Sequence, residues 1–142
     1  MQETQFDETL DQILARDHRY HRDAYHFIRE ALDFTQKLQA RERRGPLRHV
    51  TGQELLEGIR QHGLAQFGPM AITVFEEWGV RRSADFGEIV FNMVEGGLLK
   101  KTQEDSHADF EGGYDFCEAF QKPFLPDGKL RADTDAAKSN SN

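Results

Sequence analysis

Histidines near the N-terminus are the first residues whose type and spacing could do chemistry. His18 and His21 lie three residues apart, a spacing that places both on one face of a helix, and imidazole nitrogens bind divalent metal ions. The same face carries Arg22 and Arg29, whose positive charges oppose a cation. His26 lies too far round the helix to help complete the three protein ligands that a catalytic zinc site needs. We therefore expect solvated or ion-paired side chains here and predict no metal site.

A basic segment over residues 41–48, with the sequence RERRGPLR, is the best candidate for anion binding. Guanidinium groups form strong hydrogen bonds to phosphate and carboxylate oxygens. The segment could contact nucleic acid or an acidic protein, or it could be a solvated loop that offsets the chain's own acidic stretches. Two further arginines follow at 81–82. The candidate anion or partner contacts are Arg41, Arg43, Arg44, Arg48, Arg81 and Arg82.

Motifs of known catalytic chemistry are not recognisable in the chain. It has no phosphate-binding glycine loop, nucleophile elbow or dinucleotide fingerprint, and Cys117 has no histidine at a motif spacing. We predict no catalytic residue and no cofactor. An enzyme would need a polar site that no known motif marks. His49, Arg60 and His62 are candidates for it only because their side chains are of types that catalyse reactions.

Composition indicates one soluble domain of modest size. The chain has 142 residues, of which 37% are hydrophobic and 30% charged, and its eleven phenylalanines argue against disorder. No apolar run reaches the length that spans a bilayer, and the acidic N-terminus lacks the order of a secretion signal. The single cysteine cannot form an internal disulfide, which favours a reducing compartment. We expect a cytoplasmic protein without membrane contact, with one domain over residues 1–125 and a flexible polar tail over residues 126–142.

Charge is unevenly distributed within the net −7. Residues 16–50 carry a local balance of +4, whereas residues 51–97 carry −4. An anionic partner would therefore meet the N-terminal third of the chain and not its middle.

Hydrophobic periodicity and capping residues predict a mainly helical fold. An N-terminal helical pair is expected over residues 7–15 and 20–39. A third helix begins at Thr51, which forms a capping box with Glu54. Gly63 within it would let another helix approach closely, and the cost of Gly58 and Gly63 in a helix implies that packing offsets it. The next helix covers residues 69–78, with Met70, Ala71, Val74, Phe75 and Trp78 as its apolar face.

The strongest helical pattern lies over residues 86–95, with Ser83 or Asp85 as its cap. Residues 98–102 are predicted as a strand, and residues 110–120 as a β-hairpin about Gly112 and Gly113. The predicted class is therefore mainly α with a small β-hairpin, an α+β fold.

The predicted order of elements over residues 51–120 resembles a winged helix-turn-helix, although any compact core of three helices looks similar. The outward face of the 86–95 helix would hold Glu88, Phe91, Asn92 and Glu95. Affinity for duplex DNA comes largely from cations on phosphates, so this acidic face disfavours DNA. An acidic face with an exposed aromatic ring suits a protein partner better.

Four stretches of the sequence together resemble the Minf-type conserved-hypothetical family of small bacterial proteins. They are RHVTGQELLEGIR at 48–60, FGPMA at 67–71, WGV at 78–80 and DFGEIVFN at 85–92. The similarity covers most of the chain, from about residue 20 to residue 120. It implies a cytoplasmic bacterial domain and transfers no catalytic or binding residue.

The sequence does not name a function. A non-enzymatic protein-interaction or regulatory module is the preferred interpretation, with contacts through the 86–95 helix, the arginine segment or self-association. One alternative is a nucleic-acid-associated protein that uses residues 41–48, and another is an enzyme with an unrecognised polar site.

Overall fold

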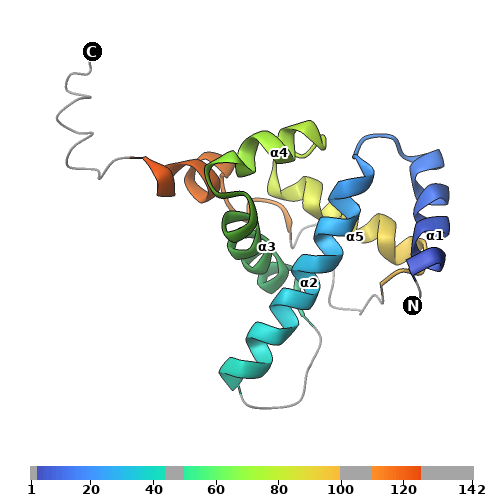
Figure 1. Cartoon of the computed structure of the whole chain (residues 1–142), viewed down its shortest axis with the longest axis horizontal. Coiled ribbons are helices and arrows are strands. Elements are labelled where there is room, and N and C mark those ends of the chain that lie inside the picture. The colour runs from blue at the N-terminus through green and yellow to red at the C-terminus, as the bar shows by residue number, and fades with distance from the viewer. Residues whose placement is uncertain (1–2, 44–49, 100–109, 126–142) are drawn as a thin grey trace.

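The computed structural model describes residues 3–43, 50–99 and 110–125, and these residues fold as helices and turns (Figure 1). The segments predicted as helices are helical. Two short turns at the C-terminal end, the π-helical η3 and the 3-10 helix η4, complete the described fold. The elements in chain order are α1 (Glu3–Arg16), α2 (Arg22–Arg43), α3 (Gly52–Phe67), η1 (Gly68–Met70), α4 (Ala71–Glu77), α5 (Ser83–Glu95), η3 (Cys117–Gln121) and η4 (Lys122–Phe124).

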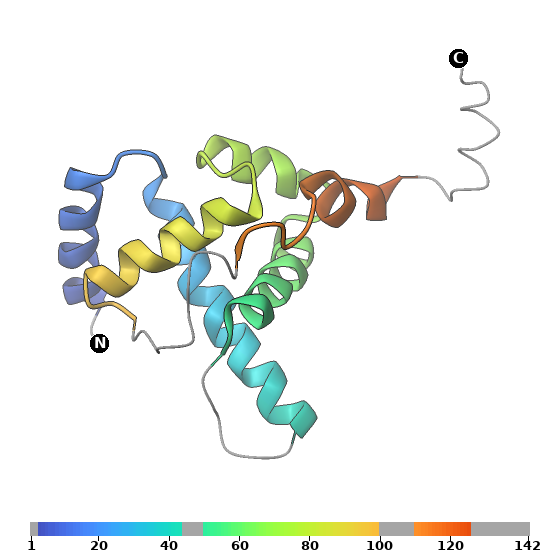
Figure 2. The same cartoon turned by 180° about the vertical axis from the view of Figure 1, so that it is seen from behind.

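The long helix α2 organises the arrangement. It packs against α1, α3 and α5, and α1 also contacts α5. Figures 1 and 2 show α3 and the C-terminal turns on one side of α2 and α1 on the other. Each of these helices can therefore bury its apolar stripe against a neighbour, as the amphipathic pattern requires.

Aromatic side chains form the centre of the core. The Phe75 ring of α4 lies 5.0 Å from the Phe120 ring and 5.4 Å from the rings of Phe27 and Phe86, measured between centroids. All four side chains are almost fully buried. Tilted and edge-to-face pairs at such distances add to the free energy gained by burial alone. The phenylalanines thus join α2, α4, α5 and the C-terminal turns.

The predicted start of α3 is confirmed. The Glu54 amide donates to Thr51 Oγ1 (3.1 Å), and the Thr51 amide donates to Glu54 Oε1 (3.0 Å). The next junction is also as expected, since α3 ends before Gly68, whose φ of 54° suits glycine.

Gly58 lets α2 and α3 approach closely, a role that the sequence had suggested for Gly63. A Cβ atom at this position would lie 1.7 Å from Thr35 Oγ1 of α2, inside any possible contact distance. Gly63 is also close-packed, because a Cβ there would lie 3.0 Å from the Phe75 ring. The helix–helix contact therefore offsets the conformational cost of these glycines.

The predicted strand and β-hairpin are wrong. Leu98 and Leu99 follow α5 as a bend, residues 100–109 lie outside the described residues, and none of the described residues forms a strand. Gly112 does form a turn, with φ of 67°, but helical turns follow it. The reason is spacing: Phe116 and Phe120 are four residues apart and both buried, which suits a helical turn and not alternation in a strand.

Without the hairpin, the predicted α+β class is wrong. The predicted winged-helix-like portion over residues 51–120 is wrong too, because a wing is a β structure. The described fold is all helical. The predicted tail over residues 126–142 lies outside the described residues.

Ser83 anchors the C-terminal segment to the start of α5. Its buried hydroxyl donates to the Phe110 carbonyl (2.6 Å) and accepts from the Gly113 amide (3.1 Å). A buried polar group needs such partners, so this contact fixes where the segment returns to the helices.

Within the described ranges, no helix combines the length and the apolar character needed to cross a membrane.

Candidate interaction surfaces

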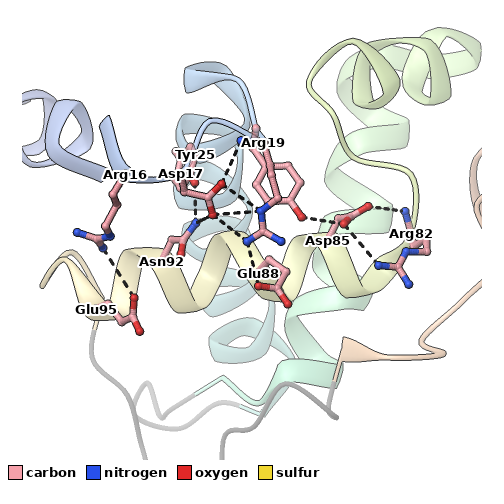
Figure 3. A network of polar contacts seen from close by, with 10 residues as sticks. Arg16, Asp17, Arg19, Tyr25, Arg82, Asp85, Glu88, Asn92 and Glu95 are labelled. Atoms are coloured by element: carbon pink, nitrogen blue, oxygen red, sulfur yellow. Dashed lines mark hydrogen bonds and ion pairs between the residues drawn. The ribbon is translucent and has the colours of Figure 1, made fainter. Parts of the chain in front are cut away.

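The α5 face predicted to meet a partner lies against the connection between α1 and α2 (Figure 3). Asn92 Nδ2 donates to Asp17 Oδ2 (2.9 Å) and to the Tyr25 hydroxyl (3.0 Å). Arg19 Nη2 donates to Glu88 Oε1 (3.2 Å). The polar side chains of this face therefore have partners within the chain.

The other two residues of the predicted face also make internal contacts. Glu95 is ion-paired with Arg16 at 3.9 Å, and both side chains are exposed. The Phe91 ring is partly buried and meets the Phe110 ring edge to face, with centroids 6.1 Å apart. All four residues of the predicted face thus have contacts inside the fold, and an external partner for this face stays a prediction.

Arg19 fixes the Asp17 carboxylate. Arg19 Nη2 donates to Asp17 Oδ2 (2.8 Å), and Nε and the backbone amide of Arg19 both donate to Oδ1 (3.0 Å). These bonds hold the pKa of Asp17 well below its usual range and raise that of Arg19. The charges of Asp17 and Arg19 cancel each other. With pKa values shifted in these directions, neither group is suited to transferring a proton.

Tyr20 extends the network to the beginning of α5. Its hydroxyl donates to Asp85 Oδ1 (2.7 Å), while Asp85 Oδ2 accepts from the amides of Arg81 (2.9 Å) and Arg82 (3.1 Å). Burial, followed by the bond to Asp85, raises the pKa of Tyr20. Asp85 therefore binds, from within α5, the two amides that precede the helix. The helix begins at Ser83 and its N-cap is Arg82, so the prediction of Ser83 or Asp85 as the cap is wrong.

The predicted arginines do not form one patch in the described parts of the chain. Arg41 is exposed in the last turn of α2, whereas Arg81 and Arg82 are exposed on the connection between α4 and α5. Figure 1 shows this end of α2 projecting away from α4 and α5. Arg43 ends α2, and Arg44 and Arg48 lie outside the described residues.

Of the residues offered for an enzyme site, the two that the structure describes, Arg60 and His62, do not converge. Arg60 binds Glu57 through Nη2 at 2.6 Å, which lowers the pKa of Glu57. His62 lies two positions further along α3, so it points in another direction, and its ring lies 5.4 Å from the Phe27 ring. His49 lies outside the described residues. Over residues 3–43, 50–99 and 110–125, no group of three or more His, Cys, Asp or Glu side chains could hold a metal ion.

One surface segment of the described chain carries no acidic or basic side chain at all. Residues 63–75 contain no Asp, Glu, Lys, Arg or His, although 30% of the whole chain is charged. They form the end of α3, the turn η1 and the start of α4. Ala71 and Phe75 of this segment are buried as predicted, but Met70 is 55% exposed.

Two more large hydrophobic side chains are exposed close to this segment. The turn η3 packs against η1 and α4, and η4 follows η3 directly. Phe124 in η4 is 45% exposed and Leu125 after it 40%. We call Met70, Phe124 and Leu125, together with the η1 and η4 turns that carry them, the apolar end.

Sequence periodicity missed the apolar end because Met70 falls on the same helical stripe as Ala71 and Phe75. The 3-10 turn η1 breaks that register, so Met70 faces solvent. The absence of charge over residues 63–75 is the feature of the sequence that could have indicated it.

The margin of the apolar end carries a pair of opposite charges. Lys122 Nζ lies 3.5 Å from Glu118 Oε2, and the two side chains are 50% and 66% exposed. Glu118 belongs to η3 and Lys122 begins η4. On the side of α4, the uncharged segment is followed directly by two exposed acidic residues, Glu76 and Glu77.

Comparisons with protein-family models, with curated proteins and with solved structures each gave no match. The resemblance to the Minf-type family stays a prediction.

Proposed function

We propose that this protein is a non-enzymatic interaction module that binds a protein partner through its apolar end. The observation that carries the proposal is the exposure of Met70, Phe124 and Leu125 beside an uncharged stretch of surface. The centres of protein interfaces are depleted in charge and enriched in methionine and aromatic residues. Single exposed hydrophobic residues are ordinary on any surface, but a group of them on packed turns marks a contact site.

The internal use of the charged residues supports a structural and not a catalytic role for them. Asp17, Arg19 and Glu88 bind one another between the α1–α2 connection and α5. Catalytic groups with shifted pKa values usually line a cleft and face substrate. Here the shifted groups hold two helical elements together.

The nucleic-acid alternative has less support. Arg16 and Arg19 are paired with Glu95 and Glu88 of α5. The exposed Arg41 lies away from Arg81 and Arg82. Binding to phosphates needs several cations on one surface. We also propose a cytoplasmic setting, which the free, exposed thiol of Cys117 supports.

Site-specific photocrosslinking in an extract of the native cells tests the proposal. A photoreactive phenylalanine derivative replaces Met70 in one sample and Gln12, exposed on α1, in the control. We expect discrete protein adducts from position 70 only. An excess of unlabelled wild-type protein should compete for them, and an excess of the Met70→Glu, Phe124→Glu double variant should not.

Two outcomes would overturn the proposal. One is the same adduct pattern from positions 70 and 12. The other is equal competition by the wild-type protein and the double variant, because the apolar end would then contribute nothing to binding.

A further inference from the structure

We infer that His62 forms a pH-sensitive contact between α2 and α3, in which the protonated imidazole pairs with Glu30 and helps to hold the two helices together. The inference is independent of the proposed function, because it concerns an inner contact of the fold and not the apolar end. It follows from the aromatic and the polar groups that surround the His62 side chain.

Two phenylalanine rings of α2 flank the His62 ring. The rings of Phe27 and Phe34 each lie 5.4 Å from it between centroids, with interplanar angles of 29° and 34°. Phe27 and Phe34 are about 10 Å apart along the helix axis, so the imidazole fits between them. The faces of aromatic rings carry partial negative charge and attract cations. This position therefore favours the protonated imidazole over the neutral one.

The surroundings of the ring nitrogen Nε2 favour a proton as well. His62 Nε2 is buried and has no hydrogen-bond partner among the described residues. Glu30 Oε1 of α2 lies 3.5 Å from it. A nitrogen without a proton would turn its lone pair toward a carboxylate, whereas a protonated nitrogen can donate to it. Protonation thus converts an unsatisfied buried nitrogen into one member of an ion pair between two helices.

Other charged groups on and around α3 do not oppose this pair. Asp33 of α2 is paired with Lys37 (3.0 Å), Glu57 of α3 with Arg60 (2.6 Å), and Arg29 of α2 lies over a ring of α1. The charged side chains of the other helical elements packed against α3 are acidic, and at longer range they attract a cation. They are Glu76 and Glu77 of α4, Asp85, Glu88 and Glu95 of α5, and Glu118 of η3.

Mild acid should therefore strengthen the contact between α2 and α3. Histidine in an unfolded chain loses its proton near pH of about 6.5, where a glutamate carboxylate is already ionised. An ion pair made only by the protonated ring adds its full stability below that pH and loses it as pH rises further. The stability that this pair contributes thus changes within the range of pH in which most other side chains of the fold keep their charge.

A double-mutant cycle at two pH values tests the inference. Glu30→Gln keeps the size of the side chain without its charge, and His62→Phe keeps an aromatic ring beside Phe27 and Phe34 without its nitrogen atoms. Urea denaturation of the full chain, the two single variants and the double variant gives the coupling between the two side chains. The other histidines are the same in all four chains, so their contributions cancel. At pH of about 5.5 we expect a coupling of about three- to tenfold in the unfolding equilibrium constant, and at pH of about 8 less than about twofold.

The pair of Asp33 and Lys37 provides a matched control on the same helix. It contains no histidine, so the cycle of Asp33→Asn and Lys37→Gln should give the same coupling at both pH values. A His62–Glu30 coupling that changes with pH no more than this control would overturn the inference. Far-ultraviolet circular dichroism checks that each variant folds. If His62→Phe does not fold, Glu30→Gln alone decides: it should destabilise the chain about threefold or more at pH of about 5.5 and less at pH of about 8, and equal losses would overturn the inference.

Discussion

Asp17 lies on the α1–α2 connection, and its carboxylate accepts hydrogen bonds both from Arg19 of the same connection and from Asn92 of α5. The side chain is 15% exposed, so these charge-assisted bonds are only partly screened by water. We expect Asp17→Asn to lower the free energy of unfolding by about 1–3 kcal/mol, measured by urea denaturation at neutral pH. Asp33→Asn removes an exposed carboxylate that pairs with Lys37 and should cost less than about 0.5 kcal/mol.

The pH dependence of the stability of Asp17→Asn shows how much of the loss comes from the charge of Asp17 and how much from the shape of its side chain. The pKa of Asp17 is lowered in the folded state, mainly by the bond from Arg19, so its contribution to stability is complete well above the unfolded value of about 3.9. It is lost progressively as pH falls below about 5. The gap in stability between wild type and Asp17→Asn should therefore narrow from neutral pH toward pH of about 3. A gap that stays constant would mean that the charge of Asp17 contributes nothing.

Residue types alone could not have predicted the hydrogen bond between Asp17 and Asn92. Asp17 and Asn92 are 75 positions apart, and no periodicity links them. The sequence placed Asn92, Glu88 and Glu95 correctly on one side of a helix, but it could not indicate that the preceding helix connection would lie against that side.

Helical elements were predictable where local chemistry decides them. Thr51 and Glu54 cap α3 whatever lies around them, and the apolar stripe of α5 needs a helix to bury it. The C-terminal segment was not predictable in the same way. Gly112 and Gly113 are typical of a hairpin turn, and only burial of Phe116 and Phe120 against α4 and α5 selects helical turns instead.

The C-terminal turns provide a matched pair of phenylalanines for testing that packing. The Phe120 side chain is fully buried, with its ring 5.0 Å from the Phe75 ring, whereas Phe124 is 45% exposed. We expect Phe120→Ala to lower the free energy of unfolding by about 3–5 kcal/mol and Phe124→Ala by less than about 0.5 kcal/mol. Thermal unfolding measures both. Equal losses would contradict the packing of η3 onto α4.

The contact between α2 and α3 depends on the missing side chain of Gly58. In an isolated helix, Gly58→Ala would be favourable by about 1 kcal/mol. Against Thr35 the new methyl group collides with Oγ1, so we expect a net loss of about 1–3 kcal/mol in urea denaturation. Thr35→Ala in the same chain removes the colliding hydroxyl and should recover part of that loss. Without recovery, the loss would have another cause than this contact.

At the scale of the whole molecule, the helices are joined by polar contacts around an aromatic core, and the three tyrosines belong to both. Tyr20 binds Asp85, Tyr25 accepts from Asn92, and the Tyr114 hydroxyl donates to the Leu56 carbonyl (2.9 Å). Burial is the main cause that raises the pKa of each above its usual value of about 10. Together they report on three separate parts of the fold, because they lie on the α1–α2 connection, on α2 and on the C-terminal segment.

Titration of the three tyrosines at alkaline pH should therefore show whether the whole fold unfolds in one cooperative step. A raised folded pKa stabilises the protein fully below the unfolded value of about 10, and this stability is lost as pH rises further. We expect little tyrosinate absorbance while the far-ultraviolet circular dichroism stays native, followed by one joint step in which all three tyrosines ionise as the chain unfolds. A tyrosine that ionises near pH of about 10 in a chain with native circular dichroism would contradict the burial of at least one hydroxyl. Substituting each tyrosine in turn by phenylalanine would identify it.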